Sequence, residues 1–169
     1  MHARQRAEES PPRGDGNGQA QRADGRPAVQ QEAEAEEGGI DEHAAEVLRA
    51  LHTKYKLGIV SNFAIPECVQ RLLEQEDLAR FFDVIVVSGA INKRKPHPEI
   101  FEHALKQLHV TAAETVFVGD TVDADIKGPT EVGMRTIYVD RRPQKDLEQA
   151  KPTQTIKSLS ELPNALQNC

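Results

Sequence analysis

The sequence predicts an α/β fold in three layers, with helices on both faces of a mostly parallel, Rossmann-like sheet. Short apolar runs alternate with stretches in which apolar residues recur at helical spacing, from about residue 41 onward. The apolar runs also lack the polar–apolar alternation of a half-exposed strand, which indicates strands buried on both faces. Helix–strand alternation of this kind requires right-handed crossovers, and these make neighbouring strands parallel.

The individual elements follow from the same patterns. We expect strands at residues 57–61, 83–88, 115–119 and 135–139, with an edge strand at 153–156. We expect helices at 44–51, after Pro66, after Pro98 and at 122–132, a capping-box turn at 111–114, and a short C-terminal helix opened by Ser158 or Ser160. The pair Gly128-Pro129 should bend or delay the helix that contains it, because proline removes a helical hydrogen bond.

Composition divides the chain into two parts. Residues 1–39 contain no large apolar side chain except Met1 and Val29, so we expect a disordered charged tail there. A charged interaction tail, or sequence that is not natural domain sequence, are the alternatives. Residues 40–169 carry the predicted domain.

The bulk properties exclude several classes of protein. A net charge of −6 argues against non-specific nucleic-acid binding, and no apolar run is long enough to span a membrane. The N-terminus lacks the apolar core of a secretory signal. The two cysteines, Cys68 and Cys169, form neither a disulfide framework nor a metal cluster. We therefore expect a soluble cytoplasmic protein.

The strand expected at 115–119 ends in acidic residues. Asp120, Asp123 and Asp125 lie within six positions. Open α/β sheets bind ligands at the carboxyl ends of their strands, and clustered carboxylate oxygens suit Mg²⁺. These residues predict a metal site. The alternative is an acidic helix start, since Asp favours N-caps and the positive end of the helix dipole.

Two other strand ends carry groups of complementary kinds. Ser61 and Asn62 follow the first strand and offer small polar groups to an anion, while Lys95 lies in the basic loop after the second. A hydroxyl donor, a fixed cation and metal-holding carboxylates are what phosphoryl transfer needs around its charged oxygens. The alternative is that each residue simply belongs to its own turn or solvated loop.

Three motifs in this order resemble those of the haloacid dehalogenase-like (HAD) hydrolase superfamily, and most closely its phosphatases with a cap inserted after the first strand. The motifs are Leu57-Gly-Ile-Val-Ser-Asn-Phe63, Lys95-Pro-His-Pro-Glu-Ile-Phe101 and Val118-Gly-Asp-Thr-Val-Asp-Ala-Asp-Ile126. The resemblance runs from about residue 41 to residue 166. It implies that Ser61, with Asn62 beside it, binds the phosphoryl group. It also implies that Lys95 neutralises charge and that Asp120 and Asp125 hold Mg²⁺.

One family motif is missing. The family begins with an apolar strand ending in Asp-x-Asp-x-Thr, whose first Asp is the covalent nucleophile and whose second is the general acid/base. No such motif precedes Ser61: Asp15 and Asp24 follow no apolar run, and Asp41 is expected to cap a helix. Most of the cap is missing too. We expect a truncated HAD core, with true loss of the motif, as in a pseudoenzyme, as the alternative.

The missing strand also has a structural consequence. The family places it at the centre of the sheet, between the strands at 57–61 and 115–119. Its absence leaves two inner strand edges unpaired. Either those edges close on each other, or a partner chain supplies a strand, or the chain is poorly stable. Self-association through these edges is one expected outcome.

These observations together predict a Mg²⁺-dependent phosphatase acting on a small phosphorylated metabolite, inactive or nearly so in this form because the nucleophile is missing. Whether the chain is an enzyme stays open. The alternatives are a non-catalytic module that binds phosphate or a partner, and a haloacid dehalogenase of the same superfamily. The pair Asp120 and Asp125 favours the metal-dependent phosphatase, because halide displacement needs no Mg²⁺. No nucleic-acid or membrane partner is expected.

Overall fold

The computed structural model describes residues 40–141 and 146–169. The tail expected at residues 1–39 lies outside these described residues. The helices are α2 Ala44–Leu51, α3 Pro66–Gln75, α4 Ser88–Ile91, α5 Pro98–Leu108, α6 Gly128–Glu131, α7 Leu147–Ala150 and α8 Leu162–Gln167. The strands are β1 Gly58–Ser61, β2 Val84–Val87, β3 Val116–Gly119, β4 Arg135–Val139 and β5 Gln154–Ile156. Single helical turns occur at η1 Ala79–Phe81, η2 Ala112–Glu114 and η4 Leu159–Glu161, and η3 Val122–Lys127 is a π-helix.

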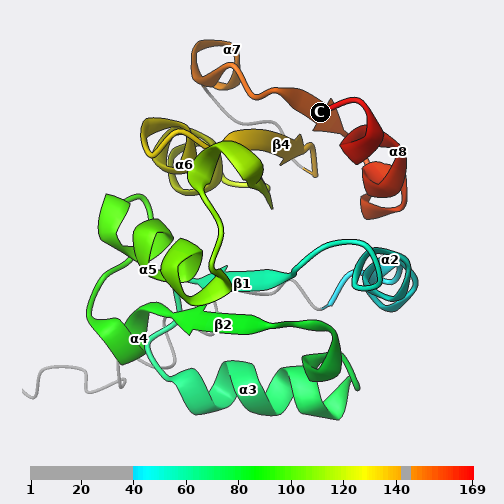
Figure 1. Ribbon diagram of the computed structural model, residues 1–169, viewed down its shortest axis with the longest axis vertical. Coiled ribbons are helices and arrows are strands. Elements are labelled where there is room, and N and C mark those ends of the chain that lie inside the picture. Colours follow the sequence, from blue (N-terminus) through cyan, green and yellow to red (C-terminus); the bar gives the residue numbers. More distant parts are fainter. Residues whose placement is uncertain (1–39, 142–145) are drawn as a thin grey trace, which may run out of the picture.

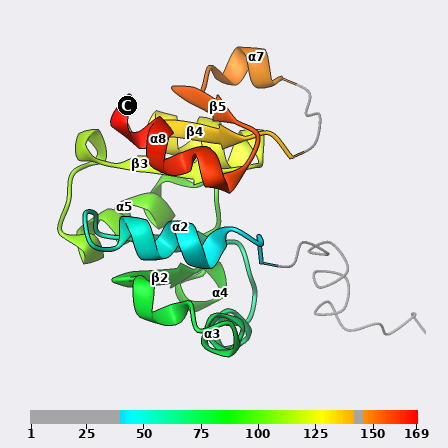
Figure 2. The same ribbon diagram turned by 90° about the vertical axis from the view of Figure 1, so that its right-hand side faces the viewer.

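All strand pairs are parallel, as the sequence predicts, but the sheet consists of two pieces. One piece pairs β1 with β2, and the other has the order β3-β4-β5. Strands β1 and β3 do not pair with each other, and residues of both line one cavity. Figures 1 and 2 show the two pieces of the sheet lying apart. Of the three outcomes expected for the two inner edges, closure on each other therefore does not occur in this structure.

Helices cover both faces of the two half-sheets, which confirms the three-layer α/β class. On one face, Val47 and Leu51 of α2 pack with Ile137 of β4 and Leu162 of α8. On the other face, Phe101 of α5 lies in the same cluster as strand residues of both half-sheets. The helices rather than backbone hydrogen bonds therefore hold the two half-sheets together, and α2 and α5 each contribute a nonpolar face, as their spacing predicts.

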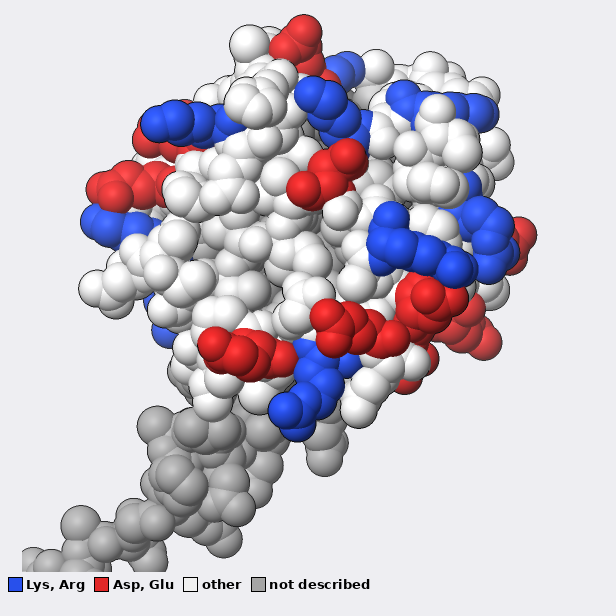
Figure 3. All heavy atoms as spheres, turned by 60° about the horizontal axis from the view of Figure 1, so that its bottom comes forward, with Lys and Arg blue, Asp and Glu red and all other residues white. Residues whose placement is uncertain are grey.

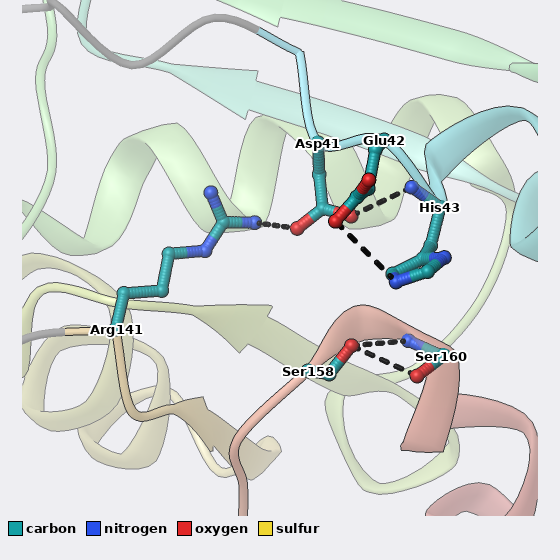
Figure 4. Close-up of polar contacts among 6 residues, drawn as sticks. All are labelled: Asp41, Glu42, His43, Arg141, Ser158 and Ser160. Carbon is teal, nitrogen blue, oxygen red and sulfur yellow. Dashed lines mark hydrogen bonds and ion pairs between the residues drawn. The ribbon is translucent and has the colours of Figure 1, made fainter.

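An ion pair crosses between the two halves at the carboxyl ends of the strands. Arg141, just beyond β4, places its Nη2 2.8 Å from Oδ2 of Asp41, which precedes α2 (Figure 4). Asp41 also accepts a hydrogen bond from the backbone N–H of His43 through Oδ1. The helix itself begins at Ala44 with His43 at its N-cap, so the prediction that Asp41 caps this helix is wrong. Asp41 instead bonds within the turn before the helix and ties that turn to Arg141 beyond β4.

Three local features differ from the sequence-based expectation or refine it. The helix expected at 122–132 is a π-helix that continues directly into the short α6, and the change from π- to α-helix falls at Gly128-Pro129, where a bend or a late start is predicted. Helix α4 lies at the start of a segment expected to be loop, and α7 lies in the polar segment before β5. Each of these two helices is only four residues long, which is too short to give a periodic pattern.

Candidate active site

The candidate site is built around the first strand end, where Asn62 fixes the loop that carries Lys95. The Asn62 side chain donates from Nδ2 to the carbonyl oxygen of Lys95 (2.9 Å), and its Oδ1 accepts from the Lys95 backbone N–H (2.6 Å). A side-chain amide that bonds both backbone groups of one residue holds that residue in one orientation. The sequence assigns Asn62 to phosphate binding, but here its amide groups position Lys95.

A second contact supports the same loop. An ideal Cβ on Gly128 would lie 2.9 Å from Cβ of Pro96 and 3.0 Å from Cε2 of Phe101, so only glycine lets the loop approach α6 this closely. The residue after Lys95 is therefore packed directly on the start of a helix. Together with Asn62, this packing fixes both ends of the short segment from which the Lys95 side chain extends.

Lys95 and Asp125 form a buried ion pair at the centre of the site. Nζ of Lys95 lies 2.8 Å from Oδ1 of Asp125, and the two side chains are only 13% and 7% exposed. The ammonium group also lies 5.5 Å from the centre of the Phe117 ring, within the range of a cation–π contact. Lys95 follows β2 and Asp125 follows β3, so the pair brings together the strand ends of the two half-sheets.

Asp125 is held from a second side by the backbone of its own turn. Oδ2 accepts a 3.0 Å hydrogen bond from the Thr121 N–H, and the Asp125 N–H donates to the Thr121 carbonyl at 2.7 Å. Gly119 permits this packing, because an ideal Cβ there would lie 2.6 Å from Oδ2. The glycine that ends β3 is thus required for the carboxylate to sit against the strand end.

The π-helix η3 explains how the turn presents Asp125. A π-helical turn inserts one extra residue per turn relative to an α-helix and is frequent at functional sites. Here it buries Val122, Asp125 and Ile126 while Asp123 points to solvent. Asp123 pairs with Lys127 at 2.8 Å with 74% of its side chain exposed, so it belongs to the surface.

The remaining predicted residues lie next to this core. Ser61 is the last residue of β1 and directly precedes Asn62, and Asp120 directly follows β3; both are half-buried. The Thr121 hydroxyl lies 3.4 Å from Oδ1 of Asp120. The structure therefore brings Asn62, Lys95 and Asp125 into direct hydrogen-bonded contact and sets Ser61 and Asp120 beside them.

The donor set is compatible with a divalent cation of the Mg²⁺ type. Asp120 and Asp125 flank one turn, and Mg²⁺ is typically bound by one or two carboxylates together with water and substrate oxygens. No cluster of three or more His, Cys, Asp or Glu residues that could hold a metal occurs within residues 40–141 and 146–169. Asp120 and Asp125 are therefore the carboxylates that the described site offers, and a metal here would depend on further oxygen donors.

Sequence reasoning missed three supporting groups. The positioning role of Asn62, the backbone N–H of Thr121 and the aromatic face of Phe117 carry no motif signal by themselves. Gly119 offers one signal, because a glycine at the end of an apolar strand and directly before an acidic residue indicates close backbone packing.

The family of the chain follows from a match over residues 19–139 to the family described as haloacid dehalogenase-like hydrolase. The chain belongs to the haloacid dehalogenase-like hydrolase family. The resemblance seen in the three motifs is thereby confirmed.

Members of this family are also found among individual relatives. A glyceraldehyde 3-phosphate phosphatase from Methanocaldococcus jannaschii is 36% identical over 114 residues, covering 67% of this chain and 50% of the relative. The chain thus spans about half the length of that relative. Among solved structures, the putative HAD-hydrolase YfnB from Bacillus subtilis, bound to magnesium, has a TM-score of 0.69 and 28% identity, covering 73% of this chain and 54% of that one. A 2-haloacid dehalogenase from Pseudomonas syringae has a TM-score of 0.64 and 28% identity, with 73% and 51% covered.

One face of the molecule carries charges of both signs. The face shown in Figure 3 carries Lys and Arg side chains interspersed with Asp and Glu over a largely uncharged background. Within the described part of the chain, no helix is both long and nonpolar enough to cross a bilayer.

Proposed function

We propose that the strand-end cluster of Ser61, Asn62, Lys95, Asp120 and Asp125 is the phosphate- and Mg²⁺-binding site of a phosphatase-type hydrolase acting on a small phosphate ester. The observation that carries the proposal is the buried Lys95–Asp125 pair at 2.8 Å. It sets a cation suited to a phosphoryl oxygen directly beside a carboxylate suited to a metal.

The proposed roles follow from where each group lies. The Ser61 hydroxyl donates a hydrogen bond to a phosphoryl oxygen, and Lys95 neutralises the charge of the bound ester. Asn62 keeps Lys95 in place through its two backbone hydrogen bonds. Asp120 and Asp125 hold Mg²⁺, which when bound supplies positive charge toward the phosphoryl oxygens. The phosphatase relative from Methanocaldococcus jannaschii supports a phosphate ester as the substrate class.

We propose that the chain as given turns over such an ester very slowly or not at all. Covalent phosphoryl transfer needs a carboxylate nucleophile besides the metal ligands. In the described residues, the site offers Asp120 and Asp125, and both are assigned to the metal. This same point supports the second candidate function, a non-catalytic module that binds phosphate. A dehalogenase is the less favoured alternative, because it has no use for the two metal-holding carboxylates.

The free thiols of Cys68 and Cys169 support a cytoplasmic location.

Calorimetric titration with Mg²⁺ and inorganic phosphate, together with a p-nitrophenyl phosphate assay, tests the proposal. We expect Mg²⁺ binding that weakens by at least about tenfold in D120N and D125N, and no turnover above background. The variant G119A should weaken Mg²⁺ binding as well, because its Cβ would displace the Asp125 carboxylate. The exposed variant D123N is the matched control and should bind as the wild type does.

Three results would contradict the proposal in different ways. Unchanged Mg²⁺ binding in both D120N and D125N would show that these two carboxylates do not bind the metal. Unchanged phosphate binding in K95M would show that Lys95 does not bind the anion. Turnover of the ester that D120N abolishes would overturn the claim of inactivity and restore a complete active site.

A further inference from the structure

We infer that Phe117 is a positioning residue for the anion site. The face of its ring holds the Lys95 ammonium in place and leaves two of the ammonium N–H groups for phosphoryl oxygens. This inference rests on the proposed function and adds to it a residue that acts through Lys95. Three observations carry it: the place of the ring, the hydrogen bonds that Lys95 forms, and the contacts that hold the ring in one orientation.

The Phe117 ring lies beside an ammonium group that has lost most of its water. Nζ of Lys95 lies over this ring, 5.5 Å from its centre, and 2.8 Å from Oδ1 of Asp125. The Lys95 side chain is only 13% exposed, so little water remains to solvate the charge. An aromatic face carries the negative part of the ring quadrupole and attracts a cation, most strongly where water is excluded. The ring therefore stabilises the ammonium at this position.

The ring holds the ammonium without using any of its hydrogen-bond donors. An ammonium group has three N–H donors, and among the described residues Nζ of Lys95 donates only to Asp125. The other two N–H groups are available to the oxygens of a bound anion. A second carboxylate in the place of the ring would take one of these donors and would also repel a phosphoryl group. An aromatic face attracts the cation and leaves both donors free.

The neighbours of Phe117 hold its ring in one orientation. The ring packs edge-to-face against Phe101, with the two ring centres 5.3 Å apart and the planes at 85°. Phe101 is itself fully buried, and an ideal Cβ on Gly128 would lie 3.0 Å from its Cε2, so α6 confines it from another side. The Lys95 backbone is fixed independently, by the two hydrogen bonds from Asn62. The ring and the ammonium are thus held by separate elements of the fold.

The alternative is that Phe117 only fills space between the half-sheets. Its ring packs on the nonpolar cluster that contains Val86 and Met134, so the variant F117L changes the packing as well as the attraction for the ammonium. Fluorination of the ring separates the two effects. Fluorine makes the ring more hydrophobic, which preserves or strengthens packing, but it withdraws electrons from the face of the ring, which weakens the attraction for a cation.

Incorporation of mono-, di- and trifluorinated phenylalanine at position 117 of the full 169-residue chain tests the inference. Binding of inorganic phosphate is measured by calorimetric titration with Mg²⁺ present. We expect each added fluorine to weaken phosphate binding, by about three- to tenfold over the series, because the ring attracts the ammonium less at each step. The free energy of unfolding in urea should fall along the same series, because the desolvated ammonium loses part of its compensation.

The matched control is a second cation–π contact, which lies before β2 and away from the carboxyl ends of the strands. The guanidinium of Arg80 lies 4.9 Å from the centre of the Phe81 ring, and the Arg80 side chain is 56% exposed. The same fluorinated residues at position 81 should leave phosphate binding unchanged. The variant F117L should weaken phosphate binding at least as much as the most fluorinated ring, because it removes the aromatic face altogether.

The possible failures separate this inference from the proposed function. Phosphate binding that stays constant or strengthens along the position 117 series, in a protein whose wild type binds phosphate, would overturn the inference and leave the proposed site intact. A rise in the free energy of unfolding along that series would show that the ring acts by packing alone. An equal loss of phosphate binding in the position 81 series would show that fluorination does not act through Lys95. A wild type that binds no phosphate would instead refute the proposed function, together with this addition to it.

Discussion

At the scale of single residues, we expect the Lys95–Asp125 ion pair to be the contact of the site whose loss costs the most folding free energy. Each charge has lost most of its hydration, and each is compensated mainly by the other, with help from Thr121 N–H and the Phe117 ring. Breaking a buried pair is costly because the remaining charge keeps its desolvation penalty without its partner. The same two residues are proposed to bind ligands, so binding and stability are coupled at this position.

Replacing Lys95 with methionine should destabilise the fold by about 3 kcal/mol, because the carboxylate of Asp125 would stay buried without its counter-charge. Urea denaturation monitored by circular dichroism measures this. The control is K93M, which breaks the Lys93–Glu99 pair at 3.0 Å between side chains that are 38% and 54% exposed. That change should cost less than about 1 kcal/mol. Equal effects of the two variants would mean that Asp125 is not held mainly by Lys95.

At the scale of elements, a helix or strand could be predicted from the sequence when it was long enough to show a periodic pattern or began with a recognisable capping motif. The periodic helices and the apolar strands were predicted within one or two residues, because burial dominates such segments. The turn Thr111 to Glu114 was predicted from its capping pattern, and both side-chain bonds are present. The extra residue in η3 could not be predicted, since π-helical hydrogen bonding has no distinct periodicity. The positioning role of Asn62 depends on contacts 33 residues away in sequence, which no local pattern encodes.

The contribution of the capping turn η2 to the stability of the protein should decrease as the pH falls. Hydrogen bonds from the Thr111 hydroxyl, and then from its backbone N–H, hold the pKa of Glu114 below its usual value. A lowered folded-state pKa stabilises the protein above the unfolded-state pKa of the group, and this contribution is lost as the pH falls through the folded-state value. In T111V the pKa of Glu114 should rise, which NMR titration measures, and the stability difference from the wild type should shrink in acid. An unchanged pKa would show that the hydroxyl contact is not formed in solution.

At the scale of the whole molecule, the division of the sheet is the dominant feature. In the part of the chain that the structure describes, no strand pairing joins the two halves. They are joined by the helices packed on both faces, by Gly128 against Pro96, and by the Lys95–Asp125 and Asp41–Arg141 pairs (Figures 2 and 4). The sequence, through its missing family motif, predicted two unpaired inner edges. It could not predict which of the three outcomes would follow, because that depends on how well the helices bridge the gap.

Amide hydrogen exchange in the isolated chain should reveal the divided sheet. Val60 and Val118 lie on the two strands with an unpaired inner edge and line the cavity between them, whereas Ile137 lies in a buried strand that is paired on both sides. We expect Val60 and Val118 to exchange at least about tenfold faster than Ile137, because exposed backbone groups need little or no opening. Equal protection at all three positions would show that the two edges are covered in solution.

The division of the sheet also shapes how the chain can fold. The paired strands of the first half come from residues 58–87, and those of the second half from residues 116–156, with no ladder linking the two sets. Every strand pairing therefore closes a loop within one contiguous stretch, which keeps the entropy cost of closure low. Each half can acquire its hydrogen bonds without waiting for the other, and the helices then bring the halves together.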